Sequence, residues 1–295
     1  NSNKPMNTTP SLLITVCLLA IWIHSSVISA QTTWMAESDT AAMRLGSHVI
    51  GCDVNADGFT DIVSTGLISA FVFLGAPNGT FSNTPSFVLP VLNAATITTD
   101  GLGLECADLN RDGFADVVVG NWTGSSYQTI LIYYGTSTGV QTQPFSWTFT
   151  SGSWYYGCDI AAADYNRDGK MDLAIGSYGY GQVYIHYGND NGISPTWTAP
   201  SAMFVHQLTF SQNIAPCDLS NDNFPDMLVG WRNSNSSQGS LWIYSNVGGS
   251  WQSPPAKVYW GNATAGAFGV DAKCGDFNAD GKKDFSVSWL ESLLA

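Results

Sequence analysis

Short apolar runs alternate with polar, glycine-rich segments along most of the chain, and no run after the first thirty residues has helical spacing. The runs are rich in Val, Ile, Leu and aromatic residues and are bounded by Gly, Asn, Asp or Ser. Such runs are typical of β-strands. We therefore expect an all-β chain after residue 30.

Four strands recur in each of several similar units. The predicted first strands include GLGLECA, DIAAA and GVDAKCG, and the second strands are DIVSTG, DVVVG, DLAIG, DMLVG and DFSVS. The third strands are AFVFLG, TILIYYG, QVYIHYG and SLWIYSN, and the fourth are SFVLP, FSWTFT, PTWTAP and AKVYWG. A repeat of this length with four short strands and Gly-rich turns is typical of a β-propeller blade.

One aspartate-rich loop, Asp-x-(Asn/Ser)-x-Asp-(Gly/Asn)-x-x-Asp, separates the first and second strands of each unit. Its copies begin 54 to 58 residues apart. We number them loops 1 to 5 and number the nine positions within each. The loops are Asp53–Asp61, Asp108–Asp116, Asp164–Asp172, Asp218–Asp226 and Asp276–Asp284.

These loops predict calcium sites, because calcium prefers several oxygen ligands from carboxylates, amides and carbonyls. Side chains at positions 1, 3, 5 and 9 and the carbonyl at position 7 supply such oxygens. Glycine at position 6 permits the bend, and Asn223, which replaces it in loop 4, also tolerates a left-handed backbone. We expect about one Ca²⁺ per repeat, up to five. The candidate ligands are Asp53, Asn55, Asp57, Phe59, Asp61, Asp108, Asn110, Asp112, Phe114, Asp116, Asp164, Asn166, Asp168, Lys170, Asp172, Asp218, Ser220, Asp222, Phe224, Asp226, Asp276, Asn278, Asp280, Lys282 and Asp284.

Two other interpretations of the loops are weaker. An EF-hand needs a Glu at position 12 and a helix on either side, whereas position 12 is Ser or an aliphatic residue and a strand follows each loop. Clusters of Asp, Asn and Gly also form polar turns without metal. Five copies in one register favour calcium over simple turns.

The residues resemble the FG-GAP/VCBS repeats that form the blades of integrin α-subunit propellers and of many secreted proteins. The resemblance covers residues 31–295. The Phe-Gly element of the family is found at Phe268-Gly269 and as Tyr156-Gly157, whereas its Gly-Ala-Pro element is degraded to GNW, GSY and GWR. The resemblance implies one Ca²⁺ between the first two strands of each blade. Since the family usually builds seven blades, it also implies that the five repeats belong to a larger ring. A five-bladed ring with a three-stranded closing blade is the alternative.

Residues 1–30 are expected to be a secretory signal peptide. The apolar stretch Leu12–Ile23 follows Lys4, and SSVISA ends in the small residue Ala30. The stretch is short for a transmembrane helix, although a retained anchor is the alternative. We therefore expect residues 31–295 to be a secreted or cell-surface-associated domain without membrane insertion after cleavage. Four glycosylation sequons within residues 31–295, at Asn78, Asn121, Asn235 and Asn262, agree with secretion.

Charge and cysteine content refine this picture. The net charge is −13, and 15 of the 23 acidic residues are loop aspartates, which argues against nucleic-acid binding. Five cysteines follow residue 30, about one per unit and each just ahead of a loop. They are either disulfide-bonded, which secretion permits, or small buried residues of the first strands. The sequence leaves the pairing open. The cysteines are Cys52, Cys106, Cys158, Cys217 and Cys274.

No catalytic constellation is predicted. The segment from Gly135 to Gly139 fits the G-x-S-x-G pattern, but a nucleophile elbow is followed by a helix, and a β-hairpin is expected here. His48, His186 and His206 have no metal-binding spacing.

Aromatic residues recur just after the second strand of the units. They serve either to pack neighbouring blades together, which we favour, or to contact glycans. The expected function is a non-catalytic adhesion or recognition module for an extracellular protein or glycan. A glycan-binding lectin and an accessory propeller of a larger secreted enzyme are the alternatives. The recurring aromatic residues are Trp122, Tyr178, Trp231 and Trp289.

Overall fold

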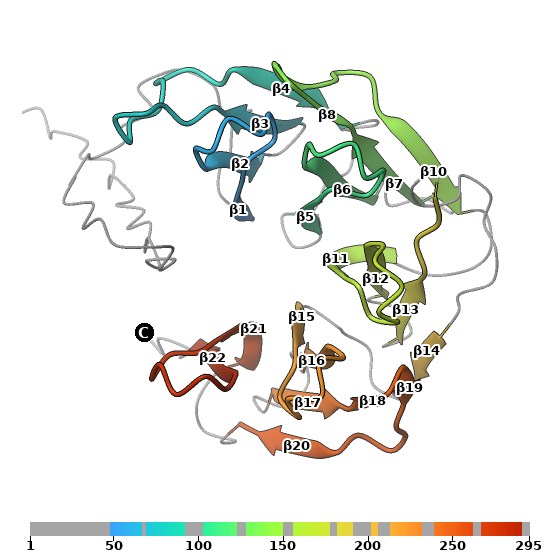
Figure 1. The fold of residues 1–295 in the computed structure, drawn as a ribbon. Coiled ribbons are helices and arrows are strands. Elements are labelled where there is room, and N and C mark those ends of the chain that lie inside the picture. The colour runs from blue at the N-terminus through green and yellow to red at the C-terminus, as the bar shows by residue number, and fades with distance from the viewer. Residues whose placement is uncertain are drawn as a thin grey trace, which may run out of the picture. The chain divides into compact units, whose positions relative to one another are not determined.

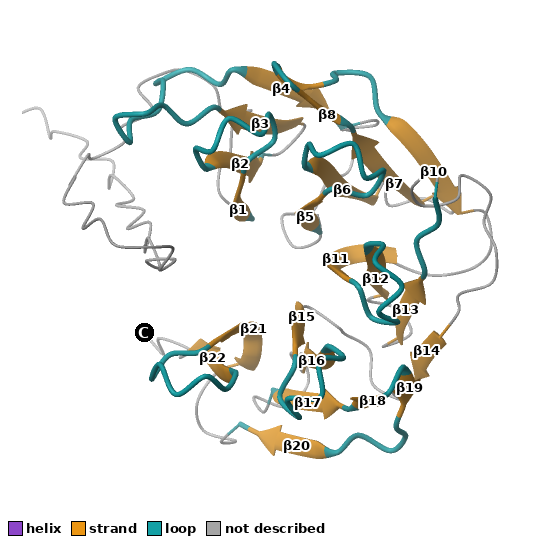
Figure 2. Cartoon of the chain, viewed as in Figure 1, coloured by secondary structure: helices purple, strands orange, loops and turns teal. Residues whose placement is uncertain are grey.

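The described part of the chain contains strands and loops only (Figure 2). This computed structural model describes residues 48–66, 69–91, 103–122, 128–149, 156–177, 182–190, 202–205, 213–231, 239–261 and 267–290. The all-β prediction is confirmed for these stretches, in which no helix is long and apolar enough to cross a membrane. The expected signal peptide lies outside them.

The strands form successive antiparallel sheets, which we number 1 to 5 (Figure 1). Sheet 1 contains β1 (Val49–Cys52), β2 (Asp61–Thr65), β3 (Ser69–Phe73) and β4 (Phe87–Pro90). Sheet 2 contains β5 (Leu104–Ala107), β6 (Asp116–Trp122), β7 (Gln128–Tyr133) and β10 (Phe145–Phe149). Sheet 3 contains β11 (Tyr156–Ala163), β12 (Asp172–Ser177), β13 (Gln182–His186) and β14 (Ala202–Val205). Sheet 4 contains β15 (Asn213–Cys217), β16 (Asp226–Trp231), β17 (Ser240–Tyr244) and β20 (Lys257–Trp260). In sheet 5 the described strands are β21 (Ala267–Gly275) and β22 (Asp284–Leu290).

The predicted four-strand unit is confirmed in sheets 1 to 4, with one correction. In sheet 3 the fourth strand was expected at PTWTAP, which lies outside the described residues, but β14 (Ala202–Val205) pairs with β13 in its place. Proline has no N–H to donate to a sheet, so the proline-free AMFV segment is better suited to this pairing. Short hairpins follow the third strands of sheets 2 and 4. They are β8–β9 (Gly135–Thr136 and Gly139–Val140) and β18–β19 (Asn246–Val247 and Ser250–Trp251).

Successive sheets pack face to face, as the blades of a β-propeller do. In β6, Val117 and Val119 join a buried cluster with sheet 1, whereas Val118 joins the next cluster, with sheet 3. Alternate residues of a strand point to opposite faces, so a strand that is apolar throughout is buried on both sides. Further clusters connect sheets 3 and 4 and sheets 4 and 5. The first strands β1, β5, β11, β15 and β21 are neighbours in that order.

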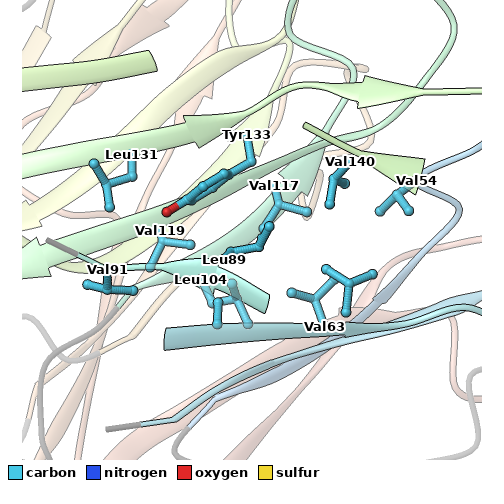
Figure 3. Packing of buried hydrophobic residues seen from close by; sticks show 12 residues of the cluster. Val54, Val63, Leu89, Val91, Leu104, Val117, Val119, Leu131, Tyr133 and Val140 are labelled. Atoms are coloured by element: carbon cyan, nitrogen blue, oxygen red, sulfur yellow. The ribbon is translucent and has the colours of Figure 1, made fainter. Parts of the chain in front are cut away.

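We call the residue at position 2 of each loop its pin, because in most loops its side chain packs between two neighbouring sheets. Val54 of loop 1 is fully buried in the cluster with sheet 2 (Figure 3). Leu109 and Tyr165 are buried in the same way against sheets 3 and 4, and Leu219 packs partly against the cluster with sheet 5. The fifth pin, Phe277, is 58% exposed. Loops 1 to 4 therefore contribute to the interface between their own sheet and the next one.

The Phe-Gly elements form irregularities in the first strands of sheets 3 and 5. The register shifts between Tyr156 and Ile160 and between Phe268 and Ala272, and Gly269 has a φ of 81°. This conformation brings its carbonyl against Gly230 of β16, where an added Cβ would lie 2.1 Å from the Gly269 oxygen. Gly230, which lies within the second strand β16, thus permits close contact between the backbones of neighbouring sheets.

Two disulfides join first strands of neighbouring sheets. Cys52 of β1 pairs with Cys106 of β5, with Cα atoms 6.4 Å apart. Cys217 of β15 pairs with Cys274 of β21, with Cα atoms 5.5 Å apart. The fifth cysteine, Cys158, is buried on β11 between these pairs. Of the two possibilities left open by the sequence, the disulfide-bonded one holds for four of the five cysteines.

Candidate calcium loops

All five loops share one backbone conformation. The residue at position 4 has a φ between 55° and 63° in every copy, although none is glycine; these residues are Ala56, Arg111, Arg167, Asn221 and Ala279. The glycines at position 6 have φ values between 83° and 91°. Asn223, at position 6 of loop 4, has a φ of 69°, as expected for an asparagine that replaces glycine. A left-handed non-glycine residue costs about 1–2 kcal/mol, so the loop conformation is held by other interactions.

Hydrogen bonds within each loop supply much of that support. In loop 2, the Asp108 carboxylate accepts hydrogen bonds from the N–H groups of Asp112 and Gly113, at 3.1 and 2.9 Å. Asn110 Oδ1 also accepts from Asp112 N–H at 3.0 Å, and Asp112 Oδ1 accepts from Phe114 N–H at 3.0 Å. Loops 1, 3 and 5 repeat these bonds. The side chains at positions 1, 3 and 5 therefore surround one short stretch of backbone.

The aspartate at position 9 has different surroundings from the side chains at positions 1, 3 and 5. Asp116 is fully buried, and its two oxygens accept from the N–H of Leu109 at position 2 (3.0 Å) and from the N–H of Gly135 after the third strand (2.9 Å). Loops 1, 3 and 4 repeat the pair of bonds, with the second donor at Gly75, Gly188 or Asn246. Position 9 thus fixes the loop to its own sheet. The sequence pattern showed the aspartate but not the two donors.

Electrostatics at position 9 reflect burial and crowded negative charge. Burial raises the pKa of Asp116 to about 6 and that of Asp172 to about 7. In both cases the backbone hydrogen bonds lower the pKa, and the two other carboxylates of the same loop raise it further. A cation among these carboxylates would oppose the last effect, because an opposite charge favours the ionised form.

The donor set of the loop fits calcium in its chemistry. Within the described stretches, no three His, Cys, Asp or Glu side chains form a metal-holding group by themselves. A loop site would therefore need the amide oxygen at position 3 and the carbonyl at position 7 together with the carboxylates. Mixed oxygen ligands of this kind are what calcium prefers. An ionised carboxylate has about four lone-pair sites, so the hydrogen bonds leave ligand capacity.

Loop 4 departs from the others. Ser220 replaces asparagine at position 3, and its hydroxyl donates to Asp218 Oδ1 at 3.4 Å. Asp226 Oδ2 accepts two N–H groups, from Leu219 and Ser220, both at 3.0 Å. Hydrogen bonds, first of all from Phe224 N–H, lower the pKa of Asp222.

A second set of polar side chains, which sequence reasoning missed, connects the first strands. Each accepts a backbone N–H from the first strand of the next sheet. The three bonds join Ala162 N–H to Glu105 Oε2 (3.1 Å), Ile214 N–H to Asp159 Oδ2, and Ala272 N–H to Asn213 Oδ1 (2.8 Å). The inner edge of each sheet would otherwise leave these donors without a strand partner. No spacing rule marks these residues, because they lie three or five residues ahead of their loops.

Asp159 makes stability depend on pH. Burial raises its pKa to about 7; the Ile214 N–H and Lys273 lower it, and Glu105 raises it. Between about pH 4 and pH 7 the folded protein holds a proton that the unfolded chain releases, so stability falls as pH rises through this range. The contribution of Asp159 to this change in stability reaches at most about 1.4 kcal/mol per pH unit.

The Asp159→Asn variant tests this dependence. Its free energy of unfolding in urea, measured in EDTA, should fall less between pH 5 and pH 7 than that of the unmodified protein. Equal losses would contradict this account.

Other sequence predictions can be compared with the structure. The segment from Gly135 to Gly139 forms hairpin β8–β9, so the expected hairpin is confirmed. His186 is buried and packs edge-on against Trp147, with ring centroids 4.9 Å apart. Among the recurring aromatic residues, Trp231 is 5% exposed, so its side chain is packed in the interior and not displayed on the surface. Tyr178 and the side chains of Trp122 and Trp289 lie outside what the structure describes, as does His206.

Comparisons with known proteins agree with this architecture. A model of the FG-GAP-like repeat matches residues 53–119, 108–175, 164–229 and 218–287. Each match begins at one loop and ends in the strand that follows the next loop. Integrin alpha-6 of Gallus gallus is 32% identical over 145 residues, covering 44% of this chain and 13% of the relative. Phosphatidylinositol-glycan-specific phospholipase D of Rattus norvegicus is 29% identical over 202 residues, covering 57% and 24%. The chain thus spans a quarter or less of the length of these curated relatives.

Among solved structures, an Agrocybe aegerita lectin that recognises non-reducing terminal N-acetylglucosamine aligns with a TM-score of 0.48 and 15% identity. The alignment covers 82% of this chain and 61% of the lectin.

Proposed function

The chain belongs to the FG-GAP-like repeat family, and from this premise we propose that it is a non-catalytic recognition module whose loops are ordered by calcium. The observation that carries the proposal is the repeated loop, with the same left-handed residue at position 4 and the same hydrogen bonds in each copy. A strained conformation that is repeated five times points to a function for the loop. In loops 1, 2, 3 and 5 we assign to it the placement of oxygen ligands around an ion.

Loops 1, 2, 3 and 5 hold the calcium in this proposal. Positions 1, 3, 5 and 9 would bind through side-chain oxygens, and position 7 through its carbonyl. The ion would neutralise carboxylates that otherwise repel one another. Because position 9 also receives an N–H from the end of the third strand, the ion would stabilise the whole sheet and not the loop alone.

Two variants of loop 2 separate metal binding from sheet structure. Asp112 is exposed and bonds only within the loop, so Asp112→Asn should leave stability in EDTA nearly unchanged. In about 2 mM calcium it should lose about 1–2 kcal/mol, the contribution of one site with a Kd of about 10⁻⁴ M. Asp116→Asn should lose about 1–3 kcal/mol even in EDTA, because it removes an acceptor from a buried N–H.

Urea unfolding of both variants, together with calorimetric counting of bound calcium, makes the test. Asp112→Asn should bind one ion fewer than the unmodified protein. The same calcium count for both proteins would contradict the assignment of loop 2.

An extracellular location is part of the proposal. It is supported by the two disulfides, which form in oxidising compartments, by the expected signal peptide at residues 1–30, and by the sequon asparagine Asn78, which is exposed. The partner would be an extracellular protein or glycan. Screening the secreted protein against glycan arrays and cell-surface proteins distinguishes a lectin from a protein-adhesion module.

A second candidate function is that of an accessory propeller in a larger secreted enzyme, and the alignment with phospholipase D supports it. The chain matches 24% of that relative's length, as an accessory module of a larger enzyme would. In that case we assign the propeller a binding role beside the catalytic part. The length of the full reading frame distinguishes this candidate from a free-standing module.

A further inference from the structure

Loop 4 differs from the other loops at position 3, where Ser220 replaces asparagine. In loops 1, 2, 3 and 5 the asparagine at position 3 offers a carbonyl oxygen, which already accepts the N–H of position 5. In loop 4 the Ser220 side chain is shorter, and its hydroxyl points to Asp218 Oδ1. The asparagines also donate from Nδ2 to the carboxylate at position 5, at 3.0–3.2 Å. The change that separates loop 4 is therefore the loss of the amide carbonyl oxygen, which is an oxygen ligand of the kind that calcium prefers.

Asp226 at position 9 of loop 4 accepts more backbone hydrogen bonds than its counterpart in loop 2. Asp226 Oδ2 accepts two N–H groups, whereas the corresponding oxygen in loop 2 accepts one. Asp222 Oδ1 accepts the N–H of Phe224 at 2.9 Å, as the aspartate at position 5 of the other loops accepts the N–H at position 7. Hydrogen bonds to an ionised carboxylate stabilise its charge as a cation would.

Asn246, in the adjacent hairpin β18–β19, donates hydrogen bonds to loop 4. It is fully buried and occupies the place that glycine holds in sheets 1 to 3. Its N–H donates to Asp226 Oδ1 at 2.8 Å, and its Nδ2 donates to the carbonyls of Tyr165 (2.7 Å) and Pro225 (3.2 Å). One side chain therefore ties loop 4 to position 2 of loop 3.

Arg167 of loop 3 places a permanent positive charge at the same contact between loops 3 and 4. The Arg167 guanidinium carbon lies 5.4 Å from the centre of the Phe224 ring. The positive charge is attracted to the electron-rich face of the ring. Phe224 is position 7 of loop 4, the residue whose carbonyl would otherwise be a calcium ligand.

We infer that loop 4 is completed by the protein's own donors and stays free of calcium while the other four loops bind it. The inference rests on the proposed function for loops 1, 2, 3 and 5. It assigns loop 4 a separate role, as the joint that holds sheets 3 and 4 together when calcium is absent. Ser220 and Asn223 are the two residues that distinguish it from a calcium loop.

Amide hydrogen exchange with and without EDTA tests the inference in solution. Removal of about 2 mM calcium should speed exchange in residues 108–116 of loop 2 about 20-fold, for a Kd of about 10⁻⁴ M. Exchange in residues 218–226 of loop 4 should change less than about twofold. An equal acceleration in both loops would overturn the inference, whereas no acceleration in any loop would remove the calcium proposal on which it rests.

Calcium anomalous scattering from crystals grown with calcium locates the ions loop by loop. Peaks are expected in loops 1, 2, 3 and 5 of the unmodified protein, and an additional peak in loop 4 of the Ser220→Asn/Asn223→Gly variant. A peak in loop 4 of the unmodified protein, or none there in the variant, overturns the inference. Peaks in none of the loops contradict the calcium proposal itself.

Discussion

Gly230→Ala should destabilise the protein by about 3 kcal/mol or more, as expected for overpacking that a rigid backbone cannot relieve. The new Cβ would lie 2.1 Å from the carbonyl oxygen of Gly269 and 3.1 Å from its carbonyl carbon. Both residues belong to strands, β16 and β21, so neither backbone can move without disturbing its sheet. Urea unfolding of the purified variant measures the loss.

Gly120→Ala provides an independent copy of this experiment, because its Cβ would lie 2.0 Å from the Gly157 oxygen. Gly79→Ala is the matched control. Gly79 has a φ of 74°, and no heavy atom lies within 4 Å of an added Cβ. This substitution should therefore lower the free energy of unfolding only by the cost of a left-handed alanine, about 1–2 kcal/mol. A loss at Gly230 no larger than that at Gly79 would contradict the close backbone contact between sheets.

Leu109→Ala should lower the free energy of unfolding by about 2–5 kcal/mol. Leu109 is 1% exposed and lies in the cluster that joins sheets 2 and 3, so its removal leaves a cavity in the joint. Phe277→Ala changes the equivalent position of loop 5, where the side chain is 58% exposed. It should change stability by less than about 0.5 kcal/mol, as surface substitutions usually do.

Denaturant unfolding of the two variants side by side makes this comparison. If the residue at position 2 served only the conformation of its own loop, both substitutions would have similar effects. Similar losses would therefore contradict the role of position 2 as a pin between sheets.

The strands and loops could be predicted because each depends on local pattern. The apolar runs that became β6 and β16 are buried on both faces, which makes them continuous and easy to recognise. The loop repeats fixed the register of the units. The one displaced strand, β14, followed an expected segment that contained two prolines.

Contacts between sheets were not predictable from the sequence. Two cysteines 54 residues apart pair only because β1 and β5 are neighbours. Asp159 and Asn213 bond to strands of the next sheet, and nothing in their local sequence marks them for that role. The same holds for Asn246, which reaches 81 residues back along the chain to Tyr165.

Position 9 of the loops shows how a correct pattern can conceal a second role. The sequence presents Asp116 as one of four equivalent oxygen-bearing side chains. In the structure it is buried and joins the loop to Gly135 of β8, whereas Asp112 is exposed. The difference arises from donors at Leu109 and Gly135, the second of which lies 19 residues away.

The central claim is that calcium stabilises this propeller through its loops, and calorimetric melting with and without EDTA tests it most directly. At about 2 mM calcium and a Kd of about 10⁻⁴ M, each occupied loop contributes about 1–2 kcal/mol. For a domain of this size, each kcal/mol shifts the midpoint by about 2–4 °C. With four occupied loops, EDTA should lower the midpoint by more than about 10 °C, and added calcium should restore it. An identical midpoint in EDTA and in calcium would contradict the account.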